Sequence, residues 1–156
     1  MIIIGIDPGI ERLGWSVIEK NGKAIKRLDS GVKKTLSSKK EEGRLLEISE
    51  FIDELCQKYK PEHLCVERIF FSSNAKTAIT IGGVRGVVML SAAKHKIPVK
   101  EFAPLEVKMA ICGYGKADKS AVWRMVKMSI DLPQKKFLDD ESDALAIALS
   151  GAYSIR

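Results

Sequence analysis

This chain of 156 residues lacks long apolar runs. Its first apolar run stops at Asp7 and is too short for a signal peptide. No segment approaches the roughly 20 apolar residues that a membrane-spanning helix needs. We therefore expect a soluble, cytoplasmic protein that has no membrane partner.

Cysteine and histidine are also scarce. The three cysteines, Cys56, Cys65 and Cys112, are odd in number and form no CxxC pair, so we expect buried, reduced thiols. Only two histidines are present, His63 and His95, which disfavours a zinc site built from histidine and cysteine.

What the chain has is an ordinary globular composition with an excess of positive charge. Apolar residues make up 46% and charged residues 29%, and the length suits one domain spanning residues 1–156. Lysine and arginine number 26 against 20 acidic residues, a net charge of +6. Such a balance favours a polyanionic partner, because neutralising phosphates releases counterions, although many basic proteins bind no nucleic acid.

Apolar patterning predicts an antiparallel opening to the fold. Residues 2–6 are a β-branched run typical of a strand covered on both faces. Residues 13–20 and 23–32 follow as two strands. We expect Asn21 and Gly22 to form the hairpin turn between them, with positive φ at both positions.

The remainder alternates between helices and strands. Two short strands are expected at 63–67 and 97–102, and alternation with helices predicts that they run parallel to the first strand. The expected fold is α/β: a mixed five-stranded sheet flanked by helices. The predicted helices are residues 41–59, 74–94, 104–112, 118–130 and 140–154.

Acidic residues stand at the ends of two predicted strands. Asp7 ends the first strand and Glu67 ends the fourth. If these strands are parallel neighbours, both acids lie at the edge where α/β sheets bind ligands. Each also has an ordinary explanation, because Asp is common before Pro-Gly turns and a strand-final Glu is often solvated.

A denser acidic cluster precedes the last predicted helix. Asp139, Asp140, Glu141 and Asp143 lead into the apolar run 144–149. Capping and the helix dipole explain one or two acids at a helix start. Asp140 and Asp143, however, are three residues apart and share a helix face, which can be held against the strand ends.

Carboxylates without histidine or thiolate are hard oxygen ligands. They suit Mg²⁺, with Mn²⁺ as a substitute, and two ions together can assist hydrolysis of a phosphodiester. The sequence therefore favours a metal-dependent nuclease at Asp7, Glu67, Asp140 and Asp143.

Several segments, in order along nearly the whole chain, resemble the bacterial RuvC-type Holliday-junction resolvases of the ribonuclease-H-like nuclease superfamily. They are residues 4–9 (IGIDPG), 14–15 (GW), 66–70 (VERIF), 82–86 (GGVRG), 107–108 (VK), 119–120 (KS) and 140–148 (DESDALAIA).

The resemblance implies a ribonuclease-H-like fold and an endonuclease of homologous recombination and DNA repair. A homodimer would bind a four-way DNA junction and make paired, symmetric nicks with Mg²⁺, leaving 5′-phosphates. Branch-migration helicase proteins are possible partners in this family. The metal-binding catalytic acids would be Asp7, Glu67, Asp140 and Asp143, with Asp7 shared between two ions.

The resemblance also implies DNA-contacting residues. Phe70 would stack on a base near the junction centre, and Lys108 and Lys119 would face the backbone near the cut, where Lys119 could also act in catalysis. Arg85 is a further expected DNA contact. By default, Phe70 would be core and the two lysines would be solvated.

Dimerisation has a physical motive, because a junction must be cut on two strands and a two-fold dimer supplies two equivalent sites. Small residues in the second helix, Gly82, Gly83, Gly86, Ala92 and Ala93, make it the candidate interface. Intrachain packing explains the same residues equally well.

Other functions share these features. A ribonuclease-H-like nuclease acting on RNA–DNA hybrids or other branched DNA would use the same acids. A non-catalytic junction-binding module would not need them. An actin-like phosphate-binding protein would share residues 5–9, but such folds need a second domain.

Overall fold

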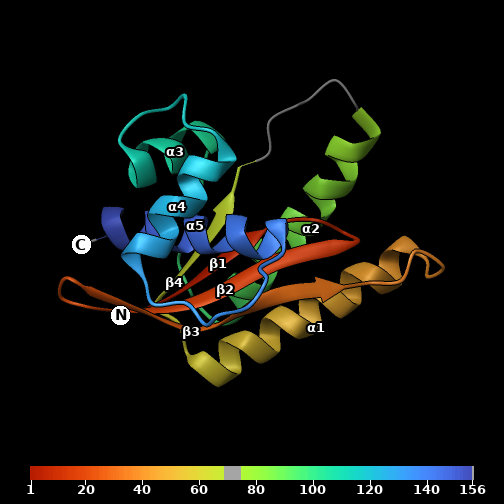
Figure 1. Cartoon of the computed structure of the whole chain (residues 1–156). Helices are drawn as coiled ribbons and strands as arrows, with labels where there is room; N and C mark the ends of the chain where they lie inside the picture. The colour runs from red at the N-terminus through yellow and green to blue at the C-terminus, as the bar shows by residue number, and fades with distance from the viewer. Residues whose placement is uncertain (69–74, 156) are drawn as a thin grey trace.

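The computed structural model describes residues 1–68 and 75–155, and within these ranges five strands form one mixed sheet. The strand order is β3-β2-β1-β4-β5, antiparallel from β3 to β1 and parallel from β1 to β5 (Figure 1). The elements are β1 (Ile2–Asp7), β2 (Arg12–Asn21), β3 (Ala24–Lys34), α1 (Glu41–Tyr59), β4 (His63–Glu67), α2 (Ala75–Lys94), β5 (Val99–Phe102), α3 (Pro104–Cys112), α4 (Lys119–Ser129) and α5 (Asp139–Ser154).

Helices cover both faces of the sheet, as the doubly buried pattern of β1 predicts. On one face, Ile4 and Ile6 of β1 pack with residues of α1 and α2. On the other face, Ile3 packs with Cys65 and with residues of α3, α4 and α5. Figure 1 shows α5 lying across the sheet, with α4 and α3 outside it and α1 on the opposite side. Side chains that alternate along a strand therefore enter different layers.

The predicted hairpin forms, but its turn differs from the expectation. Asn21 pairs with Ala24, so the two loop residues are Gly22 and Lys23 rather than Asn21 and Gly22. Of these loop residues, only Gly22 has a positive φ (60°). Glycine at the first central position is typical of a type II′ turn, which needs positive φ at one position only.

Two other predicted boundaries shift for local reasons. The fifth strand begins at Val99 and not at residue 97, because the Ile97 amide donates to the carbonyl of Ala92 and so belongs to the turn after α2. Helix α4 begins at Lys119 because Asp118 is its N-cap, with a side chain that accepts from the Ala121 amide.

Helix α5 packs unusually close to the sheet. A Cβ atom on Gly5 would collide with the carbonyl oxygen of Ala144, and one on Gly14 would collide with the carbonyl oxygen of Asp140. Between these contacts, the Ser16 hydroxyl donates to the Ala144 carbonyl at 2.8 Å. Glycine at positions 5 and 14 thus lets the acidic start of α5 lie directly on β1 and β2.

The cysteines are free thiols, as predicted, but they are not all buried: Cys56 and Cys65 are, whereas Cys112 is half-buried. Among the described residues, no helix has both the length and the apolar character to cross a membrane.

Candidate active site

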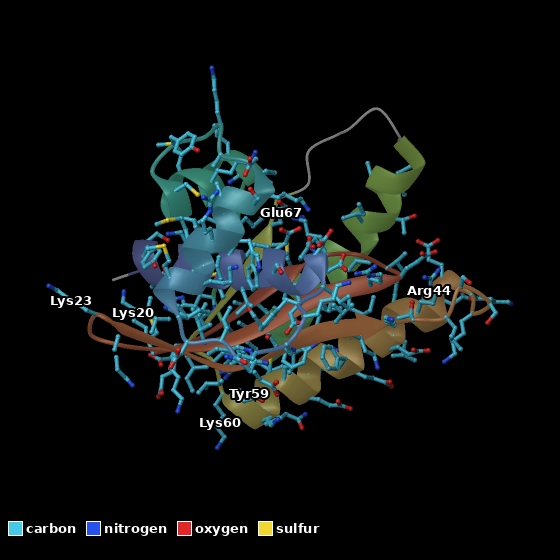
Figure 2. The ribbon with its side chains drawn as sticks, in the orientation of Figure 1. Lys20, Lys23, Arg44, Tyr59, Lys60 and Glu67 are labelled. Carbon is cyan, nitrogen blue, oxygen red and sulfur yellow. The ribbon has the colours of Figure 1, made fainter. Side chains whose placement is uncertain are left out.

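Strand alternation directs Asp7 and Glu67 toward the same helix. Asp7 is on the same face of β1 as Ile3 and Gly5, and Glu67 is on the same face of β4 as Cys65. That face is covered by α5. Because β1 and β4 are parallel with Ile6 opposite Val66, the two acids end their strands side by side. Figure 2 shows Glu67 at this edge, well away from Lys23 in the hairpin.

The first turns of α5 bring the other predicted acids to this edge. Asp140 and Asp143 are both half-buried, and the backbone of Asp140 rests on Gly14, the residue paired with Asp7 across β1 and β2. Asp139 is exposed. The fold thus brings segments separated by more than a hundred residues to one edge of the sheet.

The acids interact electrostatically. The pKa of Asp7 is raised to about 7. Burial is the main cause, and the negative charges of Glu67, Asp143 and Asp140 add to it, while Lys119 opposes it. Burial also raises the pKa of Glu67, with a further contribution from Asp143. Negative charge at this edge is therefore only partly compensated by the protein.

Two basic side chains neutralise the α5 acids. Arg12, at the start of β2, forms an ion pair with Asp140. The Lys119 ammonium donates to Oδ2 of Asp143 at 2.8 Å, and this bond raises the pKa of Lys119. Within residues 1–68 and 75–155, no three acidic, histidine or cysteine side chains are already close enough to hold one ion.

The donor set nevertheless fits a divalent cation. It consists of carboxylates, the hard oxygen ligands that Mg²⁺ and Mn²⁺ prefer. Asp7 and Glu67 carry a charge that burial makes costly, and a dication would offset that cost. Asp140 and Asp143 could join it by exchanging Arg12 and Lys119 for the ion.

Glu141, the acid that follows Asp140 on α5, has a different environment. Glu141 is 3% exposed and accepts hydrogen bonds from the Ser30 hydroxyl at 2.6 Å and from the Lys135 ammonium at 2.8 Å. It therefore anchors the start of α5 to β3. Sequence reasoning missed this anchor and the Arg12 ion pair, because nothing local identifies Ser30 or Arg12, more than a hundred residues away, as a partner.

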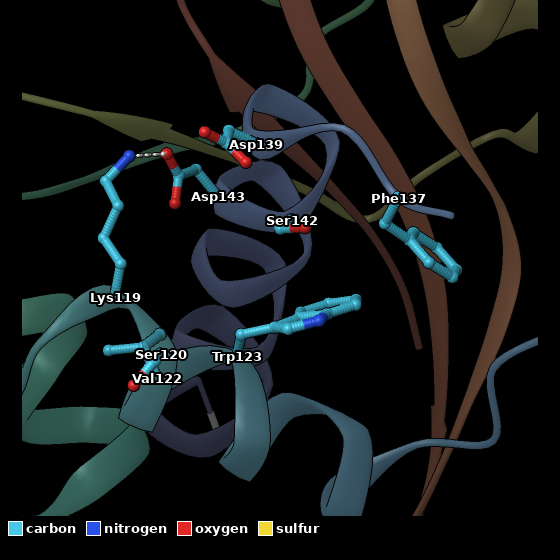
Figure 3. A pocket seen from close by; sticks show the side chains of 8 residues that line it. All are labelled: Lys119, Ser120, Val122, Trp123, Phe137, Asp139, Ser142 and Asp143. Atoms are coloured by element: carbon cyan, nitrogen blue, oxygen red, sulfur yellow. Dashed lines mark hydrogen bonds and ion pairs between the residues drawn. The ribbon is translucent and has the colours of Figure 1, made fainter. Parts of the chain in front are cut away.

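Lysine side chains and cavities adjoin the acids. One cavity of about 250 Å³ is lined by Glu67, Lys108, Lys119 and Asp143, among others. A neighbouring cavity of about 210 Å³ shares Lys119 and Asp143 with it. Figure 3 shows Lys119 reaching from α4 to Asp143 on α5. The structure thus places both predicted backbone-facing lysines beside the acids.

Arg85, another predicted DNA contact, forms an ion pair away from these acids. Arg85 on α2 donates through Nε and Nη2 to the two carboxylate oxygens of Glu101 on β5, at 2.8 and 2.6 Å. Phe70 lies outside the described residues. The roles of Arg85 and Phe70 on DNA stay predictions.

Sequence comparisons cover nearly the whole chain. Residues 3–151 match the family model described as "Crossover junction endodeoxyribonuclease RuvC". Proteins of the same name from Alkaliphilus metalliredigens and Prochlorococcus marinus are 42% and 44% identical over 154 and 156 residues. These matches cover 99% and 98% of this chain and 94% and 99% of the two relatives.

A solved structure agrees with the sequence matches. The Thermus thermophilus RuvC in complex with Holliday junction substrate superimposes with a TM-score of 0.92 at 33% identity, covering 98% of this chain and 93% of that one. The chain therefore belongs to the RuvC family of crossover junction endodeoxyribonucleases, the metal-dependent resolvases of Holliday junctions.

Proposed function

We propose that this Holliday-junction resolvase cuts its DNA by metal-assisted hydrolysis at Asp7, Glu67, Asp140 and Asp143. The observation that carries the proposal is the convergence of Asp7 and Glu67, at the ends of the parallel strands β1 and β4, with the acids at the start of α5; the raised pKa of Asp7 supports it. A protein that places partly uncompensated carboxylates together at the carboxyl ends of parallel strands has the ligands for a cation. The chain would act as one nuclease domain, in the bacterial cytoplasm where the chromosome lies.

Each acid has a part that follows from its position. Asp7, the most central of the four by its charge interactions, would be shared between two Mg²⁺ ions, and Mn²⁺ should substitute. Glu67 would bind from β4, and Asp140 and Asp143 from α5. When bound, the ions supply an activated water and stabilise the leaving oxygen of the phosphodiester. Because the backbone of α5 packs directly against Gly14, the distance between the acids of α5 and those of β1 and β4 would be constrained.

Lys119 and Lys108 would act on the phosphate. Lys119 donates to Asp143, and with Asp143 on an ion its ammonium would be free to contact a phosphate at the acids. A preorganised cation there stabilises the negative charge that develops during cleavage. Lys108 lines the same cavity and would hold the adjacent backbone.

Two further DNA contacts are part of the proposal. Phe70 would stack on a base near the junction centre, and such stacking is worth about 1–3 kcal/mol. Arg85 would contact the backbone by exchanging Glu101 for a phosphate.

A homodimer would supply the second active site, and α2 is its proposed interface. Ile79 and Leu90 on this helix are 74% and 57% exposed, and Gly86 on the same side is exposed too. Ala92, by contrast, is buried within the chain against α1, so the small residues serve both intrachain and proposed interchain packing. A branch-migration helicase would be a further partner.

The experiment that tests the proposal uses a four-way junction with each strand labelled in turn. Matched substrates are a linear duplex and an RNA–DNA hybrid of the same sequence, each with and without Mg²⁺. We expect Mg²⁺-dependent, symmetric nicks with 5′-phosphate ends in the junction alone. Cleavage of the RNA–DNA hybrid at the same rate as the junction would contradict junction selectivity. Cleavage in EDTA would contradict a metal-dependent mechanism.

A further inference from the structure

Two aromatic side chains lie next to the acids without a role in the proposed chemistry. Trp123 on α4 and Phe137 just before α5 have ring centroids 5.1 Å apart and planes inclined at 54°. Both are half-buried, so each ring packs partly on the core and keeps part of its surface accessible. Figure 3 shows both rings to the right of α5, with Lys119 and Asp143 to its left.

Three neighbouring cavities that share lining residues form a row past these rings, which is called the groove below. The cavity at Glu67 and the cavity beside it share Lys119 and Asp143. That second cavity shares Trp123 and Phe137 with a third of about 520 Å³. The groove thus runs from the proposed cleavage site, past the aromatic pair, and along the loop that precedes α5.

The far end of the groove is basic. Lys127, Lys135 and Lys136 line the third cavity, against one acid, Asp131. The Lys127 ammonium lies 5.9 Å from the Trp123 ring centroid, and the Lys135 ammonium lies 4.6 Å from that of Phe137. Lys135 is also paired with Glu141, whereas Lys127 and Lys136 have no ion pair among residues 1–68 and 75–155.

We propose that this groove binds the DNA strand that leaves the cleavage site, with a base stacked on Trp123 and phosphates contacting Lys127 and Lys136. The proposal rests on the proposed nuclease function. A groove that tracks a strand combines basic residues for the backbone with aromatic faces for bases. A purely structural role, in which the two rings pack the loop before α5 against the core, would explain the buried part of each ring. It does not explain why lysines and neighbouring cavities lie around the accessible side of the two rings.

The first test changes only exposed lysines, so folding is not at risk. The double variant Lys127→Gln, Lys136→Gln is compared with Lys23→Gln, Lys26→Gln, which removes the same charge at the distant hairpin (Figure 2 labels Lys23). Binding of a four-way junction is titrated in Ca²⁺ at several salt concentrations. We expect roughly 5- to 20-fold weaker binding and a salt slope lower by about 2 for the groove variant. Equal affinity and slope in both double variants would overturn the proposal.

The second test reports on Trp123 directly. In a Trp15→Phe background, Trp123 is the only tryptophan, and a stacked base should quench its fluorescence when the junction binds. Adding Lys127→Gln and Lys136→Gln should reduce the quenching. Trp123→Phe should keep most of the affinity and Trp123→Leu should lose several-fold, with melting curves confirming that both variants fold. If the fluorescence of Trp123 does not change when the protein is saturated with the junction, the proposed stacking of a base on Trp123 is wrong.

The two levels of the proposal fail differently. If the wild-type protein cuts the junction but the groove variants bind like the hairpin control, only the groove assignment is lost. If the wild-type protein neither binds nor cuts a junction, the proposed function fails and the groove assignment with it.

Discussion

Carboxylates at two places in the molecule have opposite environments. Two acids beside or on α1 have close partners: Asp29 of β3 accepts from the Tyr59 hydroxyl at 2.8 Å and lies 3.7 Å from the Lys58 ammonium. Asp53 lies 3.6 Å from the Lys94 ammonium. At the strand ends, Asp7 and Glu67 have no such hydrogen bond or ion pair among the described residues, and they interact with further acids instead.

The first kind of acid stabilises the fold through hydrogen bonds and ion pairs. The second kind is held near other acids by the packing of the fold, at a cost in repulsion. Removing a partnered acid such as Asp29 costs stability and leaves chemistry alone. If the proposed site is right, removing Asp7 should relieve repulsion and abolish cleavage. The predictions that follow test this contrast.

The largest effect is expected for Asp7→Asn, which removes the central ligand while keeping its shape. Junction cleavage should fall by about 10³-fold or more, a loss of about 4 kcal/mol or more in transition-state stabilisation. Junction binding without metal should stay equal or become tighter, because one charge that opposes the phosphates is gone. Single-turnover cleavage and gel-shift titration measure the two quantities.

Asp29→Asn is the matched control. It should cleave at the wild-type rate and lose about 1 kcal/mol of unfolding free energy, since its hydrogen bond and ion pairs weaken. Loss of junction binding in Asp7→Asn, or loss of cleavage in Asp29→Asn, would contradict the distinction.

A smaller effect on cleavage, about 10- to 100-fold, is expected for Gly14→Ala. Its Cβ would collide with the backbone carbonyl of Asp140, so α5 must move away from β2 and carry its two acids with it. We also expect a loss of about 1–3 kcal/mol in unfolding free energy from overpacking. Denaturant melts and cleavage assays check both.

Gly43→Ala provides the comparison in α1, where a Cβ meets nothing within 4 Å. It should raise the unfolding free energy by about 0.5–1 kcal/mol and leave cleavage unchanged, because alanine is the better helix former. If Gly14→Ala cleaves as fast as Gly43→Ala, the close packing of α5 against β2 is not needed for cleavage.

The pH dependence should reflect Asp7. Its folded pKa of about 7 lies above the ordinary 3.8, so the folded state holds a proton that the unfolded state has lost between these values. In EDTA, stability should therefore fall as the pH rises from about 4 to about 7, and less so in Asp7→Asn. Thermal melts at a series of pH values test this.

Cleavage should change in the opposite direction. At low Mg²⁺, the rate should rise up to about tenfold per pH unit below pH 7, as the carboxylate becomes ionised, and level off above it. Higher Mg²⁺ should move the midpoint to lower pH. If the midpoint of the pH–rate profile does not change with the Mg²⁺ concentration, Asp7 is not a ligand of the ion.

The smallest effect is expected for Arg12→Gln. Arg12 pairs with Asp140 and so competes with an ion for it. Its removal should lower the Mg²⁺ concentration for half-maximal thermal stabilisation by roughly threefold or more, because a nearby positive charge is lost. Lys34→Gln, across the β2–β3 pair from Arg12, is the control. Weaker Mg²⁺ binding in Arg12→Gln would contradict competition.

Much of the fold was predictable because its signals are local. Helix α1 and strand β4 have the bounds that were predicted from the sequence, residues 41–59 and 63–67. The parallel pairing of β1 with β4 also followed from alternating elements. The hairpin turn was wrong by one residue, because register depends on the pairing along both strands and not on the turn residues alone.

The site was predictable to the extent that its acids end regular elements. What could not be predicted were partners brought in by packing: Arg12 on Asp140, Ser30 and Lys135 on Glu141, and Glu101 on Arg85. Periodicity shows which face of an element is apolar. It does not show which residue of another element or loop will face a given charge.

The central claim is that the acids of β1, β4 and α5 bind divalent ions together, and crystals soaked in Mn²⁺ test it most directly. Anomalous difference density should appear between Asp7, Glu67 and the α5 acids, and should be absent in Asp7→Asn crystals. Density that lies elsewhere, or that persists unchanged in Asp7→Asn, would contradict the account.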